Sequence, residues 1–348
     1  MIYCNLNLIK INTILDTKTD RVQSVDMLRG LAALFVCIFH FTNGNQDFLS
    51  NHFWLKQIGS HGWVGVEIFF IISGYIIPYS LKKDEYKLRD FSKFLSKRLA
   101  RIEPPYFISI LILILLNYLG TYSPYYKGQH YDINYHNLLL HVFHLNDLLK
   151  EPWLNPVYWT LAIELQFYLL IGLTFTLIDS RKSLVFVLTL LCFLLPTMLE
   201  IPSTVFKYIP YFSLGILIFK RKSNKNQKQY TVFLELLLLV IIYLQFSVIP
   251  FIASTFSWLI ISSSINWNNK WLLKLGTISY SFYLIHIPFG GKLINLSINF
   301  FKTDVSRSFA LLVILFLTLI VSYVFYRFVE LPATKFSQFI IKNRSIVS

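Results

Sequence analysis

The segment LRGLAALFVCIFHF, residues 28–41, places two ionisable side chains, Arg29 and His40, in an otherwise apolar stretch. At about 100° and ~1.5 Å per residue, a separation of eleven positions brings both side chains to one helix face, roughly 16 Å apart along the axis. Desolvation keeps a buried imidazole neutral, the state in which it accepts a proton as a general base. Alternatively, His40 only hydrogen-bonds a neighbouring helix. Its alignment with Arg29 favours a catalytic role.

A second pair of basic residues, Arg98 and Arg101, lies in the segment SKRLARIEPPY. Residues three apart are neighbours on a helix surface, so the two guanidinium groups can act together. Guanidinium groups bind phosphate through paired, charged hydrogen bonds, so this pair suits a ligand that carries phosphate. Arginines beside a membrane span also bind lipid headgroups and fix topology. The sequence leaves both interpretations open.

Two carboxylates also lie inside apolar segments. Glu164 is in YWTLAIELQFYLL, near Trp159, and Glu67 is in GWVGVEIFFIISGY. If its segment begins outside the membrane, Glu164 reaches a depth similar to that of His40. It could then orient the imidazole, bind sugar hydroxyls, or pair with a basic group on another helix. Ionisable side chains inside a membrane cost about 2.5–3.5 kcal/mol each, and they usually face the bundle interior or a water-filled cavity.

The other histidines considered are weaker candidates. His286, in SYSFYLIHIPF, precedes Pro288, and a proline kink frees backbone groups that need a polar partner. Four histidines fall in one segment that we expect outside the membrane: His130, His136, His141 and His144. His141 and His144 are three residues apart, but no carboxylate or cysteine completes a ligand set. We therefore predict no metal site.

All of these side chains need elements that hold them inside a membrane. The chain has 348 residues, of which 55% are hydrophobic and 14% charged, and its mean hydropathy is +0.54. Apolar runs such as ALLVILFLTLIVSYVF approach the ~20 residues that cross about 30 Å of hydrocarbon. We predict an all-α, polytopic integral membrane bundle of about ten transmembrane helices. The expected spans are residues 25–43, 62–80, 104–120, 157–178, 183–199, 203–219, 230–247, 249–264, 275–296 and 308–329.

The net charge of +14 indicates orientation rather than nucleic-acid binding. With the N-terminus inside, most of the 32 lysines and arginines fall on cytoplasmic segments, as the positive-inside rule requires. We therefore predict that both termini are cytoplasmic. The three cysteines are widely spaced and indicate no disulfide framework. No P-loop, dinucleotide fingerprint or G-x-S-x-G motif occurs, which argues against ATP-driven transport and serine hydrolase chemistry.

The chain is organised as one membrane domain with short tails. We predict a cytoplasmic tail at residues 1–23, the transmembrane domain at 24–333 and a second cytoplasmic tail at 334–348. The longest interruption, residues 121–156, is expected outside, where NLLLHVFHL suits a short helix at the membrane surface. Residues 81–103 are basic with apolar residues at helical spacing, which predicts an amphipathic helix on the cytoplasmic face that leads into the third span.

Five segments in a fixed order, followed by a closing FVELP, resemble the membrane-bound acyltransferase 3 family. The segments are DMLRGLAALFVCIFHF, GWVGVEIFFIISGY, KRLARIEPPY, YWTLAIELQFYL and SYSFYLIHIPF. They extend across residues 24–333. Some relatives carry a hydrolase-like domain after the last span. Because this chain ends shortly after FVELP, we expect a transmembrane-only form.

The resemblance implies transfer of an acyl group, most often acetyl, from cytosolic acyl-CoA to a hydroxyl. The expected acceptor is a carbohydrate: a sugar, a lipid-linked glycan or a surface polysaccharide. Acetyl-CoA would be a co-substrate, and no metal or nucleic-acid partner is expected. The resemblance also implies a multi-pass protein of the bacterial plasma membrane, with membrane lipids and polysaccharide assembly proteins as candidate partners.

The resemblance and the residue chemistry together divide the candidate site into three groups. Catalysis is assigned to His40 and Glu164. Donor binding is assigned to Arg29, Arg98, Arg101 and Tyr106. Supporting roles are assigned to Glu67, Ser73, Trp159, His286 and Glu330. His40 could remove the proton of the attacking hydroxyl, or it could carry the acyl group as a transient acyl-imidazole.

A transporter or flippase of lipid-linked sugars is the alternative function, with the polar side chains lining a pathway. Transporters of this kind are often built from two matching halves with interrupted helices in corresponding positions. The sequence has no internal repeat and no such pair of helices. Acyl transfer therefore remains the favoured prediction.

Overall fold

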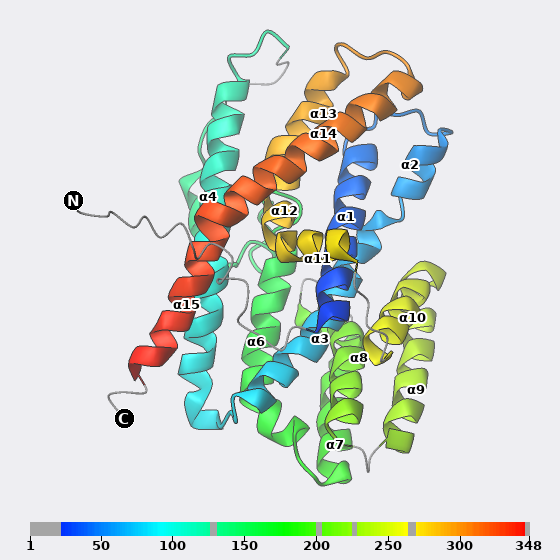
Figure 1. Cartoon of the computed structure of the whole chain (residues 1–348), viewed down its shortest axis with the longest axis vertical. Helices are drawn as coiled ribbons and strands as arrows, with labels where there is room; N and C mark the ends of the chain where they lie inside the picture. Colours follow the sequence, from blue (N-terminus) through cyan, green and yellow to red (C-terminus); the bar gives the residue numbers. More distant parts are fainter. Residues whose placement is uncertain (1–21, 126–130, 200–203, 225–227, 264–268, 345–348) are drawn as a thin grey trace, which may run out of the picture.

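The computed structural model of the chain describes residues 22–125, 131–199, 204–224, 228–263 and 269–344. Within these ranges all regular secondary structure is helical, which confirms the predicted all-α class (Figure 1). The first half contains α1 (Gln23–Asn43), α2 (Trp54–Gly59), α3 (Gly65–Lys83), α4 (Phe91–Gly120), α5 (Tyr135–Phe143), α6 (Trp159–Ile178) and α7 (Ser183–Leu194). The second half contains α8 (Val205–Ser223), α9 (Lys228–Phe246), α10 (Val248–Ser262), α11 (Lys270–Thr277), α12 (Ser279–Ile285), α13 (Lys292–Ser297), α14 (Asp304–Phe325) and α15 (Leu331–Arg344).

Six helical segments of the described chain are long and apolar enough to cross a membrane. They are Gln23–Asn43, Trp54–Lys83, Leu88–Gly120, Trp159–Ile178, Gln229–Phe246 and Asp304–Phe339. The other expected spans also fall on helices: α7, α8, α10 and the run from α12 to α13. The total of about ten spans and the cytoplasmic termini remain predictions. Most of the expected N-terminal tail, residues 1–23, lies outside the described ranges.

The centre of the bundle is the pair α3 and α8. Every α8 residue from Ile209 to Lys220 is buried, and apolar side chains of α3, α6 and α8 form the largest hydrophobic cluster. The two helices approach closely at two glycines. A Cβ atom on Gly74 would collide with the Phe212 carbonyl, and one on Gly215 would collide with the Ile71 carbonyl. Small residues permit this close packing inside membranes. It fixes α3, which supplies one wall of the cavity described below.

α4 differs from the sequence-based expectation. The sequence predicts an amphipathic helix over residues 81–103 that leads into the span at 104–120. In the structure residues 81–83 end α3, and α4 begins only at Phe91 and continues without a break through Pro104 and Pro105. Proline lacks a backbone N–H and is tolerated inside membrane helices when neighbouring helices supply partners. Close to this pair, the hydroxyl of Tyr280 in α12 donates a hydrogen bond to the Ile102 carbonyl at 2.8 Å. α4 also packs along α15 (Figure 1).

The segment between α4 and α6 folds back against the bundle. The short helix predicted there is present as α5. The Nδ1–H of His141 faces the Asn137 carbonyl at 2.8 Å, and its Nε2 accepts a hydrogen bond from the Leu154 backbone N–H at 3.1 Å. Burial lowers the pKa of His141, which keeps this ring neutral at pH 7. The next histidine, His144, reaches α4, where its Nε2 lies 3.1 Å from the Glu103 carboxylate.

The C-terminal part of the chain is anchored to α12. α14 continues through a π-helical turn, Tyr326–Glu330, into α15. Glu330 is buried in this turn, and its carboxylate accepts two hydrogen bonds from Ser281, from the backbone N–H at 3.1 Å and from the hydroxyl at 2.6 Å. π-helical turns often occur at functional sites. Here the turn joins the last long helix to the helix that carries Tyr280 and Tyr283.

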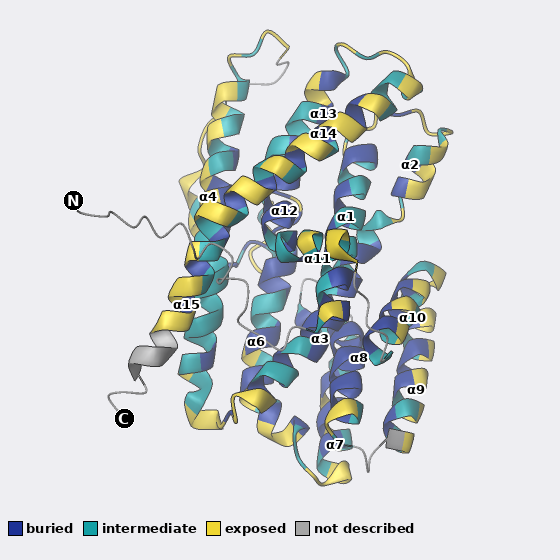
Figure 2. Ribbon diagram, in the orientation of Figure 1, coloured by how far each residue is buried: buried dark blue, intermediate teal, exposed yellow. Residues whose placement is uncertain are grey.

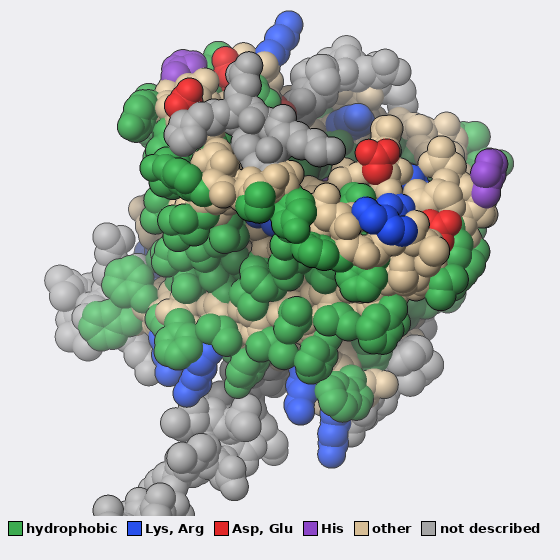
Figure 3. All heavy atoms as spheres, turned by 90° about the horizontal axis from the view of Figure 1, so that it is seen from above, with side chains coloured by type: hydrophobic (Ala, Val, Ile, Leu, Met, Phe, Trp, Pro, Cys, Tyr) green, Lys and Arg blue, Asp and Glu red, His purple; other side chains and the backbone are tan. Residues whose placement is uncertain are grey.

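The outer surface of the bundle is strongly apolar. Exposed side chains follow the outward faces of α9 and α14 (Figure 2), and on α14 they include Leu312, Phe316 and Tyr323. Figure 3 shows a broad hydrophobic area with lysine and arginine side chains along its lower edge. Apolar patches of this extent mark surfaces that contact lipid or other proteins. Together with the six apolar helices, this surface identifies the chain as a membrane protein.

Candidate active site

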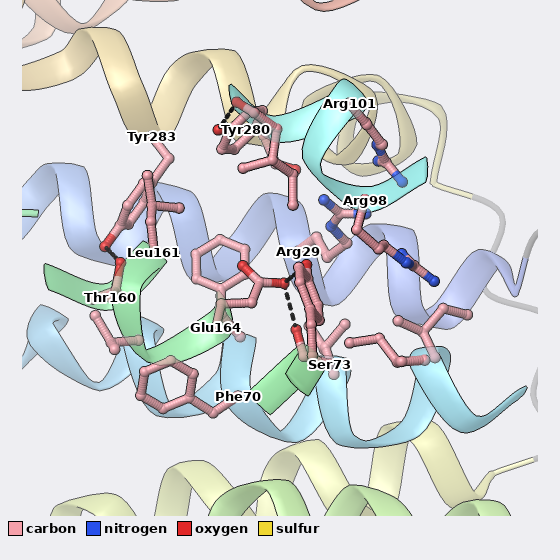
Figure 4. A pocket seen from close by; sticks show the side chains of 18 residues that line it. Arg29, Phe70, Ser73, Arg98, Arg101, Thr160, Leu161, Glu164, Tyr280 and Tyr283 are labelled. Carbon is pink, nitrogen blue, oxygen red and sulfur yellow. Dashed lines mark hydrogen bonds between the residues drawn. The ribbon is translucent and has the colours of Figure 1, made fainter. Parts of the chain in front are cut away.

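A cavity of about 130 Å³ lies between α1, α3, α4, α6 and α12 (Figure 4). It is lined by Arg29, Val66, Phe69, Phe70, Ile72, Ser73, Ile76, Ile77, Arg98, Arg101, Ile102, Thr160, Leu161, Glu164, Tyr168, Ser279, Tyr280 and Tyr283. The structure therefore brings together five of the predicted site residues, which come from four helices: Arg29, Ser73, Arg98, Arg101 and Glu164. In Figure 4 the arginines lie on one side of the cavity and Phe70, Thr160 and Tyr283 on the other, with Glu164 between them.

The charged side of the cavity carries three guanidinium groups. Arg98 is stacked between two aromatic rings, with its Cζ 5.6 Å from the centre of Phe94 and 5.7 Å from that of Tyr168. Within the described residues, neither Arg29 nor Arg101 makes a hydrogen bond or an ion pair. Cations with unused donors in a site of low dielectric attract anions strongly. This side of the cavity is therefore suited to an anionic ligand group.

Glu164 is the one carboxylate among the cavity-lining residues. One of its oxygens, Oε1, accepts hydrogen bonds from the hydroxyl of Ser73 at 3.1 Å and from that of Tyr168. These two donors come from α3 and from one turn further along α6. They fix the carboxylate between the arginines and the aromatic side of the cavity. Three cations and one carboxylate leave the wall with a positive balance of charge.

The opposite side of the cavity is closed by neutral side chains. The hydroxyls of Thr160 and Tyr283 are hydrogen-bonded at 2.8 Å, which joins α6 to α12. The ring of Phe69 packs edge-on against Tyr283, with ring centres 5.6 Å apart. This part of the wall is tightly packed and uncharged. A small apolar group in the cavity would contact this neutral wall next to the charged side.

His40 does not line the cavity; it lies beyond the closed side. Its ring centre is 5.4 Å from that of His286, and the His286 ring is 5.8 Å from Tyr283 of the cavity wall. His286 is fully buried, with Nδ1 3.2 Å from the Phe282 carbonyl, and no residue that the structure describes is a hydrogen-bond partner for Nε2. The carbonyl contact assigns the proton to Nδ1, so Nε2 has a free lone pair. The structure thus pairs two predicted histidines, with one layer of side chains between them and the cavity.

The other predicted site residues occupy separate places. Tyr106, expected in donor binding, is fully buried behind the cavity, with its ring stacked on His144 at 4.8 Å and its hydroxyl 3.3 Å from the His141 carbonyl. Its contacts fix the segment between α4 and α6. Trp159 packs on Tyr208 of α8, with ring centres 5.2 Å apart.

Glu67 and Glu330 are both buried outside the cavity. One carboxylate oxygen of Glu67, near the start of α3, has no hydrogen-bond partner within the described residues. Glu330 binds Ser281 as described above. Within the described residues, no group of three or more His, Cys, Asp or Glu side chains could hold a metal ion. His130, one of the four histidines considered above, lies outside the described ranges.

Sequence reasoning missed five polar residues of the wall: Thr160, Tyr168, Ser279, Tyr280 and Tyr283. Tyr168 could have been predicted, because it follows Glu164 by four positions and therefore lies on the same helix face. Thr160 precedes Glu164 by four positions and has the same signal. The two α12 tyrosines had none, because tyrosines near membrane interfaces are common for reasons unrelated to catalysis.

Comparison with known proteins decides the family. A sequence profile described as "Acyltransferase domain" matches residues 22–327, which is most of the chain. The chain belongs to the acyltransferase 3 family. The match contains the three arginines, Glu164 and both histidines of the pair, and it ends three residues before Glu330. No solved structure gives a significant match.

Individual relatives of this acyltransferase share part of its length. ORF330 of Acidianus two-tailed virus, whose name describes an acetyltransferase, is 30% identical over 165 residues, which cover 46% of this chain and 43% of ORF330. The O-acetyltransferase OatA of Staphylococcus aureus is 30% identical over 171 residues, which cover 46% of this chain and 26% of OatA. The chain therefore matches less than half of the length of these relatives.

Proposed function

We propose that the protein is an integral membrane O-acyltransferase that moves an acyl group, acetyl in the first instance, from acyl-CoA to a hydroxyl of a carbohydrate acceptor. The observation that carries the proposal is the cavity with three guanidinium groups around one fixed carboxylate, in a chain of the acyltransferase 3 family. The name of the relative OatA, an O-acetyltransferase, supports transfer of acetyl to oxygen.

The two sides of the cavity fit the two ends of such a donor. Phosphate groups are bound by guanidinium groups, and Arg29 and Arg101 have donors that no described residue uses. The neutral side, formed by Phe69, Thr160 and Tyr283, suits a small acyl group. We infer that the donor enters along the arginines, with its thioester directed toward Tyr283. This direction also leads toward His286 and His40.

The chemistry requires a base and a way to move the acyl group. In direct transfer, His40 takes the proton of the hydroxyl, the oxygen forms a bond to the acyl carbon, and the C–S bond breaks with its electron pair on sulfur; the proton then passes to the thiolate. In the second route, the neutral imidazole of His40 attacks the thioester carbon, and the C–S bond breaks with its electron pair on sulfur to leave an acyl-imidazole. The acceptor hydroxyl then attacks the acyl carbon, the C–N bond breaks to return the imidazole, and the hydroxyl proton passes to the thiolate. The packed layer between the cavity and His40 has to open in either route, because His40 must reach the thioester or the acceptor hydroxyl beside it.

The expected setting is the bacterial plasma membrane, where a multi-pass bundle can take a cytosolic donor and an acceptor from the other side. The candidate acceptors are a sugar, a lipid-linked glycan or a surface polysaccharide, and polysaccharide assembly proteins are candidate partners. The apolar outer surface supports a membrane location. The basic segments between the expected spans support cytoplasmic termini by the positive-inside rule.

The test uses purified full-length protein, radiolabelled acetyl-CoA and candidate glycans. We expect His40→Ala to abolish transfer while acetyl-CoA binding stays within about twofold, because His40 lies outside the cavity. His52→Ala is the matched control, because His52 is exposed in the loop after α1. Unchanged transfer by His40→Ala would rule out the catalytic role.

A thermal-shift measurement separates this function from a transporter of lipid-linked sugars. A ligand present at a hundred times its dissociation constant stabilises the folded protein by about 2.7 kcal/mol. Acetyl-CoA should therefore raise the melting temperature of the detergent-solubilised protein. Analogues of CoA that lack the sulfur or a phosphate group should show which end of the donor contributes to binding. A transporter of sugars has no reason to respond to acetyl-CoA, so the absence of any shift would contradict the proposal.

A further inference from the structure

A second, much smaller chamber lies behind Glu164. Its volume is about 10 Å³, and it is lined by Leu99, Ile102, Glu103, His144, Leu161, Glu164, Leu165 and Tyr168. Glu164 and Tyr168 belong to both walls, so the chamber and the large cavity share the same carboxylate. A site of roughly 10–15 Å³ accommodates one water molecule if two or more polar groups face it.

His144 supplies such a polar group. It is 92% buried, and its Nε2 lies 3.1 and 3.3 Å from the two oxygens of Glu103. A carboxylate at Nε2 places the ring proton there, which leaves Nδ1 as an acceptor. Nδ1 is buried and has no hydrogen-bond partner within the described residues. A buried acceptor without a partner costs about 1–3 kcal/mol, so a bound water would stabilise this site.

Glu164 supplies the second polar group. Both donors to this carboxylate, Ser73 and Tyr168, bind Oε1, and Oε2 has no donor within the described residues. A water molecule has two hydrogens, and it could donate one to His144 Nδ1 and the other to Glu164. The other ionisable groups that face His144 are Glu103 and Tyr106 of α4, Tyr168 of α6 and His141 of α5. None of them offers a donor to Nδ1.

We propose that the chamber binds one water molecule that bridges His144 Nδ1 to the Glu164 carboxylate, which makes His144 a positioning residue for the cavity. The bridge completes a hydrogen-bonded chain from Glu103 through His144 and the water to Glu164. It ties the segment between α4 and α6 to the side chain at the centre of the cavity. The water site stands on the geometry alone, whereas its effect on acyl transfer rests on the proposed function.

Two substitutions at His144 test which ring nitrogen matters, with kcat referred to the amount of folded protein because the left-handed backbone of His144 (φ 55°) favours asparagine over glutamine. The amide of asparagine occupies about the position of Nδ1, and that of glutamine about the position of Nε2. His144→Asn therefore keeps a group that can bind the water, and His144→Gln keeps a donor to Glu103. If the water bridge positions Glu164, the kcat for transfer falls about tenfold in His144→Gln and much less in His144→Asn. If the pair with Glu103 were all that matters, the order would be reversed, and that result would overturn the proposal.

A variant that fills the chamber provides an independent measurement. Leu165 lines the chamber but not the large cavity, so Leu165→Phe should displace the water and lower kcat by a similar factor. Leu169→Phe is the matched control, because Leu169 lies one turn further along α6 and is exposed. Equal kcat values in the two variants would contradict the proposal.

The water itself is tested by an experimental structure of the full-length protein at a resolution that shows ordered solvent. We expect a water within hydrogen-bonding distance of His144 Nδ1 and of one Glu164 oxygen. A chamber without this water overturns the inference. This result is separate from the proposed function: if the wild-type protein binds the water but transfers no acyl group from acetyl-CoA, the site stands and the acyltransferase assignment fails.

Discussion

Arg98 and Arg101 are neighbours on one helix, but their surroundings differ. Arg98 is stacked between Phe94 and Tyr168, and its buried Nε has no hydrogen-bond partner in the part of the chain that the structure describes. Arginine stems and guanidinium planes contribute packing as well as charge. Arg101 has no such stacking contact and no hydrogen bond within the described residues. Arg98 therefore supports both the fold and the charge of the cavity, while Arg101 is available for a ligand.

This difference predicts separable effects of two substitutions. Arg101→Ala should weaken acetyl-CoA binding by about 10- to 100-fold, because it removes charged hydrogen bonds worth about 1.5–3 kcal/mol, and it should change the melting temperature little. Arg98→Ala should weaken binding and also lower the melting temperature. Isothermal titration and thermal unfolding in detergent measure the two quantities. In the control Lys97→Ala, which removes an exposed ion pair with Asp84, donor affinity should not change.

At this scale the sequence predicted the charged residues well and the neutral ones poorly. Burial of a charge inside a membrane is costly, so Arg29 and Glu164 could be selected as candidates from sequence, but only the structure shows that they line one cavity with Arg101. Helix periodicity also placed His40 on the face of Arg29, but it could not show where the cavity ends. The structure puts side chains such as Tyr283 between the cavity and the histidine pair.

At the scale of elements, the contact between α3 and α8 sets the position of the cavity wall. A methyl group on Gly215 would collide with the backbone of α3 at Ile71. Because neither backbone can yield, Gly215→Ala should force the helices apart and destabilise the protein by about 1–3 kcal/mol. Thermal unfolding in detergent measures the effect. Gly120→Ala is the control, because a Cβ there meets no atom within 4 Å; an equal effect of both changes would show that close packing is not the cause.

The contact between Glu330 and Ser281 sets the position of α12. Removal of the carboxylate leaves the Ser281 backbone N–H and hydroxyl without their acceptor in a buried place. Glu330→Ala should therefore lower stability by about 1–3 kcal/mol and reduce acyl transfer, because Tyr280 and Tyr283 move with α12. Glu330→Gln keeps an acceptor oxygen and should recover most of both losses. Melting temperature and transfer rate, measured on the same preparations, check this; no recovery in Glu330→Gln would show that the charge itself is needed.

The helices could be predicted from sequence where the local apolar pattern and the contacts in the folded bundle favour the same structure. Each expected span coincides with a helix, because apolar periodicity and the need to satisfy backbone groups in lipid both favour helix. The exception is α4, where Pro104 and Pro105 locally disfavour the helix that the structure nevertheless continues. The helix is supported there by contacts with α12 and α15, and these elements are too far away in the sequence for a local pattern to reveal the contacts. For the same reason the link between His144 and Glu103, 41 positions apart, had no local signal.

At the scale of the whole molecule, surface and charge distribution together determine how the bundle sits in a membrane. The exposed apolar side chains of α9 and α14 need lipid around them. This determines where the membrane plane crosses the bundle, but not which end of the bundle faces the cytoplasm. The direction follows from the basic residues, which the positive-inside rule places in the cytoplasm. The last turn of α3 and the segment between α3 and α4 hold four basic residues, Lys82, Lys83, Lys87 and Arg89, whereas the loop between α1 and α2 holds no lysine or arginine.

This asymmetry predicts which loops a membrane-impermeant reagent can reach. In a variant without the three native cysteines Cys4, Cys37 and Cys192, we would introduce one new cysteine by either Asn51→Cys or Lys87→Cys, both at exposed loop positions. A charged maleimide added to intact cells should label Asn51→Cys, and it should label Lys87→Cys only after the membrane is permeabilised. Detergent-solubilised protein, in which both sites should react, controls for local accessibility. The opposite pattern would place the three arginines on the side away from cytosolic acyl-CoA, which would remove the route by which we propose that the donor reaches the cavity.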